Sequence, residues 1–314
     1  MDVPQEELQY LNIPQILKEA VSIPRFSTRT FSLITLTLIF PLSLAILVNS
    51  LFTHPLVESP HFDPRGVRLL LLYEFLYLLF LFLFSLLSTA AVVFTVASLY
   101  TSKPTSFSST LHAIPPVFRR LFFTFLYISF LMFLYNFAFI FSLVTLVLLV
   151  GDERQVVLFA CLFTVLFIVF LAVHIYITAL WHLASVITVL ESVQGWAAMR
   201  KSRELLKGKT RDAAVLVFLY FVICSIIGGF FGSVVVKGRG EYGLFVRLMV
   251  AGVLLGLSVV VNLVGLLVQS VFYYVCKSYH NQAIDKTALH DHLGGYLGEY
   301  VPLKSSIQME NLVV

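Results

Sequence analysis

Six long apolar segments dominate the pattern of the chain, at residues 31–52, 69–100, 121–150, 156–190, 213–236 and 244–276. Each exceeds the roughly 20 apolar residues that a helix needs to cross about 30 Å of hydrocarbon. Because lipid offers the backbone no hydrogen-bond partners, segments of this length must be helical. The pattern predicts an all-α, polytopic membrane protein with six transmembrane helices. The membrane domain would span 31–276, between an N-terminal segment, 1–30, and a C-terminal tail, 277–314.

A short amphipathic stretch precedes each odd-numbered apolar segment, at residues 13–29, 107–120 and 192–208. In the third stretch Trp196 and Leu205 fall on one arc of a helical wheel, and Arg200 and Lys207 fall on the other. Gly208 supplies the left-handed residue that favours a helix end. Helices of this kind lie in the membrane interface. We therefore predict three interfacial helices, each followed by two spans, repeated in parallel about an axis along the membrane normal.

The basic residues are distributed unevenly between the two sides of these spans. Fifteen of the 21 Lys and Arg residues lie in 1–30, 101–120, 191–212 and 277–314, so the positive-inside rule predicts that both termini face the cytosol. A composition of 59% hydrophobic and 12% charged residues excludes an ordinary soluble domain. The net charge of +4 sits at helix ends and in short loops, which suits anionic headgroups and does not indicate nucleic-acid binding. We expect the endoplasmic reticulum, another endomembrane or the plasma membrane.

One motif links the chain to known membrane proteins, and it consists of Glu191, Ala198, Arg200, Lys201, Ser202, Leu205 and Gly208. With weaker matches at 106–120 and 271–275, it resembles the membrane domain that is fused to some bacterial glycerophosphodiester phosphodiesterases, and the stand-alone relatives of that domain. Over its whole length, including the tail at 276–304, the chain resembles a plant family of uncharacterised six-span proteins. The bacterial catalytic domain is absent, so the resemblance implies a membrane fold and no hydrolase activity.

Polar side chains inside a membrane are costly and are functional candidates by default. The intramembrane candidates are Glu74, Asn136, His174, Asn262 and Gln269. We interpret Glu74 as a carboxylate that snorkels beside Arg68. His174 lies more than about 10 Å from His182 along one helix, too far to share a metal ion with it. The functional alternative for Glu74 is a proton or cation site. The amides are expected to bond helices to one another, with a substrate pathway as the alternative.

Small residues and cysteines give weaker signals. Gly228-x-x-x-Gly232 and Gly252-x-x-x-Gly256 would permit a close approach of helices. The three cysteines have no CxxC spacing and do not indicate disulfides. Cys276, which precedes Lys277 at a helix end, is either a palmitoylation site or an unmodified thiol, and we favour the unmodified thiol.

The sequence offers one motif with catalytic spacing. His280 and Asp285 have the HxxxxD spacing of glycerolipid acyltransferases, but only 29 residues follow Asp285, too few for a domain around the motif. His290 and His292 lie in the same tail and are better interpreted as solvated than as metal ligands. The chain has no HExxH, nucleophile triad, Gly-rich phosphate loop or CxxC pair. We therefore predict no enzyme, and no catalytic, cofactor-binding or metal-binding residues.

These observations favour a non-enzymatic membrane protein whose cytosolic face engages anionic lipid, protein partners or both. The residues expected to contact headgroups are Arg200, Lys201, Arg203, Lys207, Lys209 and Arg211. The alternative is a transporter or channel along the axis between the three units. A polar cavity lined by Glu74, Asn136 or Asn262 would favour that alternative.

Overall fold

The computed structural model describes residues 9–57, 64–101, 107–150, 155–191, 193–238 and 240–282. Throughout these ranges the regular structure is helical. Six helices are long and apolar enough to cross a membrane: Thr28–Phe52, Arg68–Tyr100, Val117–Val150, Val156–Leu190, Thr210–Val236 and Leu244–Tyr279. They coincide with the six predicted segments to within a few residues, which confirms the predicted all-α, six-span class. The predicted tail, from residue 283 onwards, lies outside the described residues.

The N-terminal part of the chain forms a surface helix followed by an irregular first span. Helix α2 (Ile13–Ser22) begins after Asn12, whose backbone N–H donates to Gln15 Oε1 at 2.9 Å. A 3-10 turn, η1 (Ile23–Phe26), contains Pro24 and separates α2 from the span. The span then consists of α3 (Thr28–Ile34), a π-helical turn η2 (Thr35–Ile39) and α4 (Phe40–Val57).

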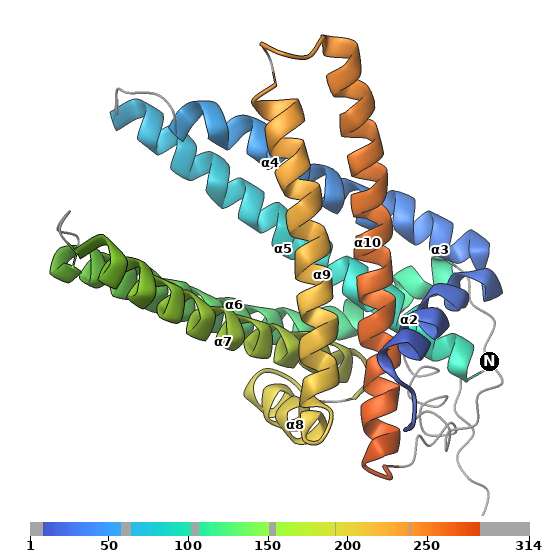
Figure 1. The fold of residues 1–314 in the computed structure, drawn as a ribbon. Helices are drawn as coiled ribbons and strands as arrows, with labels where there is room; N and C mark the ends of the chain where they lie inside the picture. The colour runs from blue at the N-terminus through green and yellow to red at the C-terminus, as the bar shows by residue number, and fades with distance from the viewer. Residues whose placement is uncertain are drawn as a thin grey trace, which may run out of the picture.

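The remaining elements are α5 (Pro64–Tyr100), α6 (Phe107–Val150), α7 (Val156–Leu190), α8 (Trp196–Leu206), α9 (Thr210–Phe230), η4 (Phe231–Val236) and α10 (Leu244–Tyr279). Figure 1 shows three helical hairpins, α4–α5, α6–α7 and α9–α10. They lie close together at the end of the molecule that carries α2 and α8, and they diverge towards the other end. We call the end with α2 and α8 the packed end.

Among the described residues, the larger of two clusters of buried hydrophobic residues lies at the packed end. Its main buried stretches fall within 86–98 of α5, 179–190 of α7 and 267–278 of α10. In contrast, no described residue of 129–150 or 155–178 is buried, and the outer part of the α6–α7 hairpin exposes many large apolar side chains. Exposed apolar surface of this extent suits lipid, because acyl chains are as apolar as the side chains they contact.

The three amphipathic stretches are helical but not equivalent. Two form the separate helices α2 and α8, whereas the second, 107–120, is continuous with the third span in the 44-residue helix α6. No glycine or proline occurs in residues 117–150, and Pro115 and Pro116 lie within α6 without ending it. Helix α8 is instead bounded by Gly195, with φ +58°, and by Gly208, with φ +84°, which confirms the predicted left-handed stop at Gly208.

The two GxxxG patterns do not mediate close contacts. A Cβ atom added at Gly228, Gly232, Gly252 or Gly256 would meet no atom within 4 Å. The close approach occurs elsewhere, because a Cβ atom at Gly265 of α10 would lie 3.0 Å from the Tyr220 ring of α9. Which glycine faces a neighbour depends on how the helices are rotated, and the GxxxG spacing alone does not determine that rotation.

Candidate functional site

A cluster of charged residues surrounds Glu191, the residue that directly follows α7. Glu191 ends the helix because its backbone is extended, with φ −125° and ψ 158°, while its N–H still donates to Ile187 O at 2.8 Å. The chain then turns at Gly195 into α8, so the end of α7 and the beginning of α8 lie together at the packed end. Glu191 therefore lies at a corner where several helices meet.

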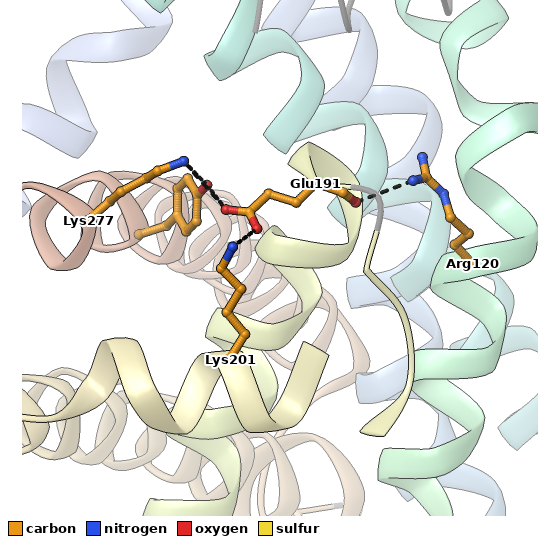
Figure 2. Close-up of polar contacts among 5 residues, drawn as sticks. Arg120, Glu191, Lys201 and Lys277 are labelled. Carbon is orange, nitrogen blue, oxygen red and sulfur yellow. Dashed lines mark hydrogen bonds and ion pairs between the residues drawn. The ribbon is translucent and has the colours of Figure 1, made fainter. Parts of the chain in front are cut away.

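The Glu191 carboxylate joins three elements (Figure 2). Its Oε2 forms an ion pair with Lys201 Nζ of α8. Its Oε1 accepts a hydrogen bond from Tyr273 Oη of α10 at 2.8 Å and lies 3.4 Å from Lys277 Nζ of the same helix. On the other side, Arg120 Nη1 of α6 donates to the backbone oxygen of Glu191 at 3.3 Å. We call Arg120, Glu191, Lys201, Tyr273 and Lys277 the junction cluster.

Electrostatics keep the junction carboxylate charged. Burial alone would raise the pKa of Glu191, but hydrogen bonds from Lys201 and Tyr273 and the charges of Lys277 and Lys201 together hold its pKa below the usual value. The side chains are only partly solvated, with exposed fractions of 14% for Glu191, 19% for Lys277 and 35% for Lys201. Solvent therefore screens these ion pairs less than it would at an open surface.

Hydroxyl groups hold the same corner in place. Thr124 of α6 lies 3.1 Å from Thr188 of α7, Oγ1 to Oγ1, and accepts a hydrogen bond from the Gly195 N–H at 2.8 Å. Ser202 of α8 donates to Leu180 O of α7 at 2.9 Å. These contacts fix the orientation of α8 against α7, and so decide which side chains of α8 point outwards.

Helix α8 has one buried and one exposed face. Its buried residues are Ala198, Met199, Ser202, Leu205 and Leu206. Of the six predicted headgroup residues, four are exposed: Arg200, Arg203, Lys207 and Arg211. The other two lie in internal ion pairs. Lys201 binds Glu191, and Lys209 lies 3.4 Å from Asp212 and 5.5 Å from the centroid of the Tyr279 ring.

Two of the predicted intramembrane amides connect helices. Asn262 of α10 donates through Nδ2 to Ser43 Oγ of α4 at 2.8 Å and accepts from Tyr220 Oη of α9 at 2.7 Å. Gln269 accepts through Oε1 from His182 Nδ1 of α7 at 2.7 Å. Helix α10 is thereby bonded to three neighbours within the membrane.

The other intramembrane candidates lie apart from this network. Asn136 is exposed and donates to Met132 O in its own helix at 2.8 Å. The His174 ring lies 5.6 Å from that of Tyr135 and 6.0 Å from that of Phe221, so it packs among aromatic rings. Glu74 is partly exposed on α5. The described residues include no group of three His, Cys, Asp or Glu side chains that could hold a metal ion.

The catalytic candidate His280 and the palmitoylation candidate Cys276 both pack against other parts of the protein. His280 Nε2 lies 3.1 Å from the backbone oxygen of Leu205, at the end of α8. Asp285, His290 and His292 lie outside the described residues. Cys276 is completely buried, so its thiol is not accessible for acylation in this conformation.

The sequence analysis singled out Glu191 as part of a motif but missed its partners Tyr273, Lys277 and Arg120. The available signal was one carboxylate at the end of an apolar span, with basic residues at the ends of two other helices on the same predicted side. That signal predicts a pairing without identifying which cation forms it.

The comparisons with known proteins identify a family but assign no activity to it. The sequence profile of a domain of unknown function, DUF8558, matches residues 1–63 and 64–312. No curated protein and no solved structure shows a significant match to the chain. With nearly its full length matched, this multi-pass membrane protein belongs to the DUF8558 family.

Proposed function

We propose that the protein is a non-enzymatic membrane component that engages anionic lipid headgroups through the exposed face of α8. This face consists of Arg200 and Arg203 of α8, together with Lys207, which follows α8, and Arg211 in the first turn of α9. In this proposal the packed end faces the cytosol, and the protein resides in an endomembrane or in the plasma membrane. A protein partner with an acidic surface could dock on the same face.

The two-sided character of α8 supports the proposal. Most of its apolar residues are buried against the helix bundle, whereas Arg200 and Arg203 are exposed at the level where a span ends. Trp196, 68% exposed at the beginning of α8, suits the membrane interface. Each basic residue near an anionic surface contributes about 1 kcal/mol of attraction. Lys201 and Lys209 are left out of the proposed face because they are ion-paired within the protein.

The sequence motif that carries the bacterial resemblance lies in the same region. The motif at 191–208, through which the chain resembles the membrane domain of some bacterial phosphodiesterases, contains Glu191, Lys201 and the buried face of α8. We propose that relatives with this motif share the α7–α8 corner and the basic face it presents.

Energy transfer from the two tryptophans, Trp181 and Trp196, to labelled lipid tests the proposal. In proteoliposomes, wild-type protein should transfer more energy to dansyl-phosphatidylserine than to dansyl-phosphatidylcholine, and added salt should reduce that preference. The Arg203→Gln/Lys207→Gln variant should lose about 1 kcal/mol of the preference per charge. A matched control, Arg68→Gln/Lys237→Gln, removes two charges from the opposite end and should keep the preference. Equal transfer to both lipids by wild-type protein would refute the proposal.

The transporter alternative draws on the buried polar side chains of α10. However, both polar atoms of the Asn262 amide, Nδ2 and Oδ1, bond neighbouring helices, and the Gln269 oxygen accepts a hydrogen bond from His182. These contacts support a role in helix packing, and we therefore place lipid engagement first.

A further inference from the structure

The junction cluster contains more positive than negative charge. Lys201 and Lys277 both contact the carboxylate of Glu191, which supplies a single negative charge. The acidic residues next along the chain do not balance this excess. Glu204 lies 3.4 Å from Arg200, and Asp212 lies 3.4 Å from Lys209.

The excess charge lies at headgroup depth and is partly buried. Glu191 directly follows a membrane span, and Lys277 lies in the last turn of α10. With 19% of the Lys277 side chain and 35% of the Lys201 side chain exposed, both ammonium groups are accessible from outside but have lost much of their water. A partly buried cation is costly unless an anion pairs with it.

The two lysines also have hydrogen-bonding capacity to spare. An ammonium group has three donors. Lys277 Nζ makes two long contacts, 3.4 Å to Glu191 Oε1 and 3.3 Å to Tyr273 Oη. Lys201 is bonded to the other oxygen of the same carboxylate. Both ammonium groups therefore lie against one carboxylate, where an added oxyanion could reach them together.

We infer that the ammonium groups of Lys201 and Lys277 bind the phosphate of an anionic membrane lipid, at a site separate from the exposed face of α8. Glu191 acts there as an internal competitor, because it occupies one side of both ammonium groups. A phosphodiester carries a single negative charge, whereas a phosphomonoester carries about −1.5 to −2 at neutral pH and offers three acceptor oxygens. The site should therefore select lipids with a terminal phosphomonoester, of which phosphatidic acid is the simplest.

A pair of variants with equal charge change provides the main test. Glu191→Gln removes the competing carboxylate, and Glu204→Gln removes an exposed carboxylate from the α8 face. Binding of short-chain phosphatidic acid to purified full-length protein would be counted by native mass spectrometry. We expect Glu191→Gln to bind it roughly fivefold more tightly than wild type, the equivalent of about 1 kcal/mol. Glu204→Gln should stay close to wild type. An equal change in both variants would overturn the inference.

Lys277→Gln provides a second variant that leaves Glu191 paired with Lys201 and Tyr273. It should lower phosphatidic acid binding severalfold, and unchanged binding would overturn the site. Inorganic phosphate, tested at the same concentration, distinguishes a lipid phosphate from free phosphate as the ligand. If it binds as well as the lipid does, the assignment to lipid is wrong. The Arg203→Gln/Lys207→Gln variant should retain this binding, so failure here is distinguishable from failure of the proposed headgroup face.

Discussion

Glu191 makes the stability of the packed end dependent on pH. Its pKa is lower in the folded protein than in the unfolded chain, because hydrogen bonds from Lys201 and Tyr273 and the charge of Lys277 outweigh the effect of burial. The folded protein therefore binds fewer protons at this group than the unfolded chain. Its stabilising contribution is fully present above the usual carboxyl pKa, near 4.5, and is lost as the pH falls through the lower, folded value.

Thermal unfolding in detergent should show this dependence. We expect the Tm of the wild type to fall on acidification below about pH 4.5, and the fall to be smaller in Glu191→Gln because that variant cannot titrate there. Glu204→Gln removes a carboxylate from an exposed ion pair and should keep the wild-type profile. If the wild type and Glu191→Gln gave parallel profiles, the junction cluster would not be the source of the effect.

Gly208 is a second residue whose role depends on local geometry. Its φ of +84° strains any residue with a Cβ atom, and a Cβ atom there would lie 2.6 Å from the Tyr279 ring. Gly208→Ala should cost about 1–2 kcal/mol from the backbone alone, with the displacement of Tyr279 adding to that cost. Gly228→Ala, where a Cβ atom meets nothing within 4 Å, is the control and should not destabilise the protein. Calorimetry or denaturant titration of the two variants measures the difference, and equal stabilities would contradict the prediction.

At the scale of elements, α10 links the other helices of the bundle. Its Asn262 bonds α4 and α9 at once, whereas Asn136 of α6 bonds only its own helix. Asn262→Leu should therefore lower the free energy of unfolding by about 0.6–2 kcal/mol for each bond lost. Asn136→Leu makes the same chemical change on an exposed face and should be neutral. The comparison requires unfolding in mixed micelles, and equal losses would mean that the Asn262 bonds contribute nothing to stability.

At the scale of the whole molecule, the basic ends of the three hairpins lie together, and we predict that this end faces the cytosol. The positive-inside rule places 1–30, 101–120, 191–212 and 277–314 in the cytosol. After the three native cysteines have been replaced, Arg203→Cys should react with a membrane-impermeant thiol reagent only from the cytosolic face. Glu241→Cys, in the loop between η4 and α10, should react only from the opposite face. Labelling of position 203 from the non-cytosolic side would invert the topology.

The sequence by itself determined the class of the protein and most helix boundaries. Hydrocarbon imposes a minimum span length and obligatory helical hydrogen bonding, so a one-dimensional pattern is sufficient to find six spans. Gly208 was also predictable, because its left-handed stop depends on the local chain alone. The fusion of 107–120 into α6 was not predicted, although the lack of a glycine or proline after Arg120 was visible in the sequence.

The tertiary structure alone decided which side chains meet. A helix that is apolar on every side has no polar face to indicate how it is rotated about its axis. The sequence therefore could not show that the GxxxG glycines face outwards and that Gly265 meets Tyr220. The same rotation turns Lys201 inwards to Glu191 and leaves Arg203 exposed, although both lie on the polar arc of one helix. The junction cluster joins residues of α6, α8 and α10 to Glu191 at the end of α7. Only the packing of these helices at one end brings two lysines to the Glu191 carboxylate and Arg120 to its backbone oxygen.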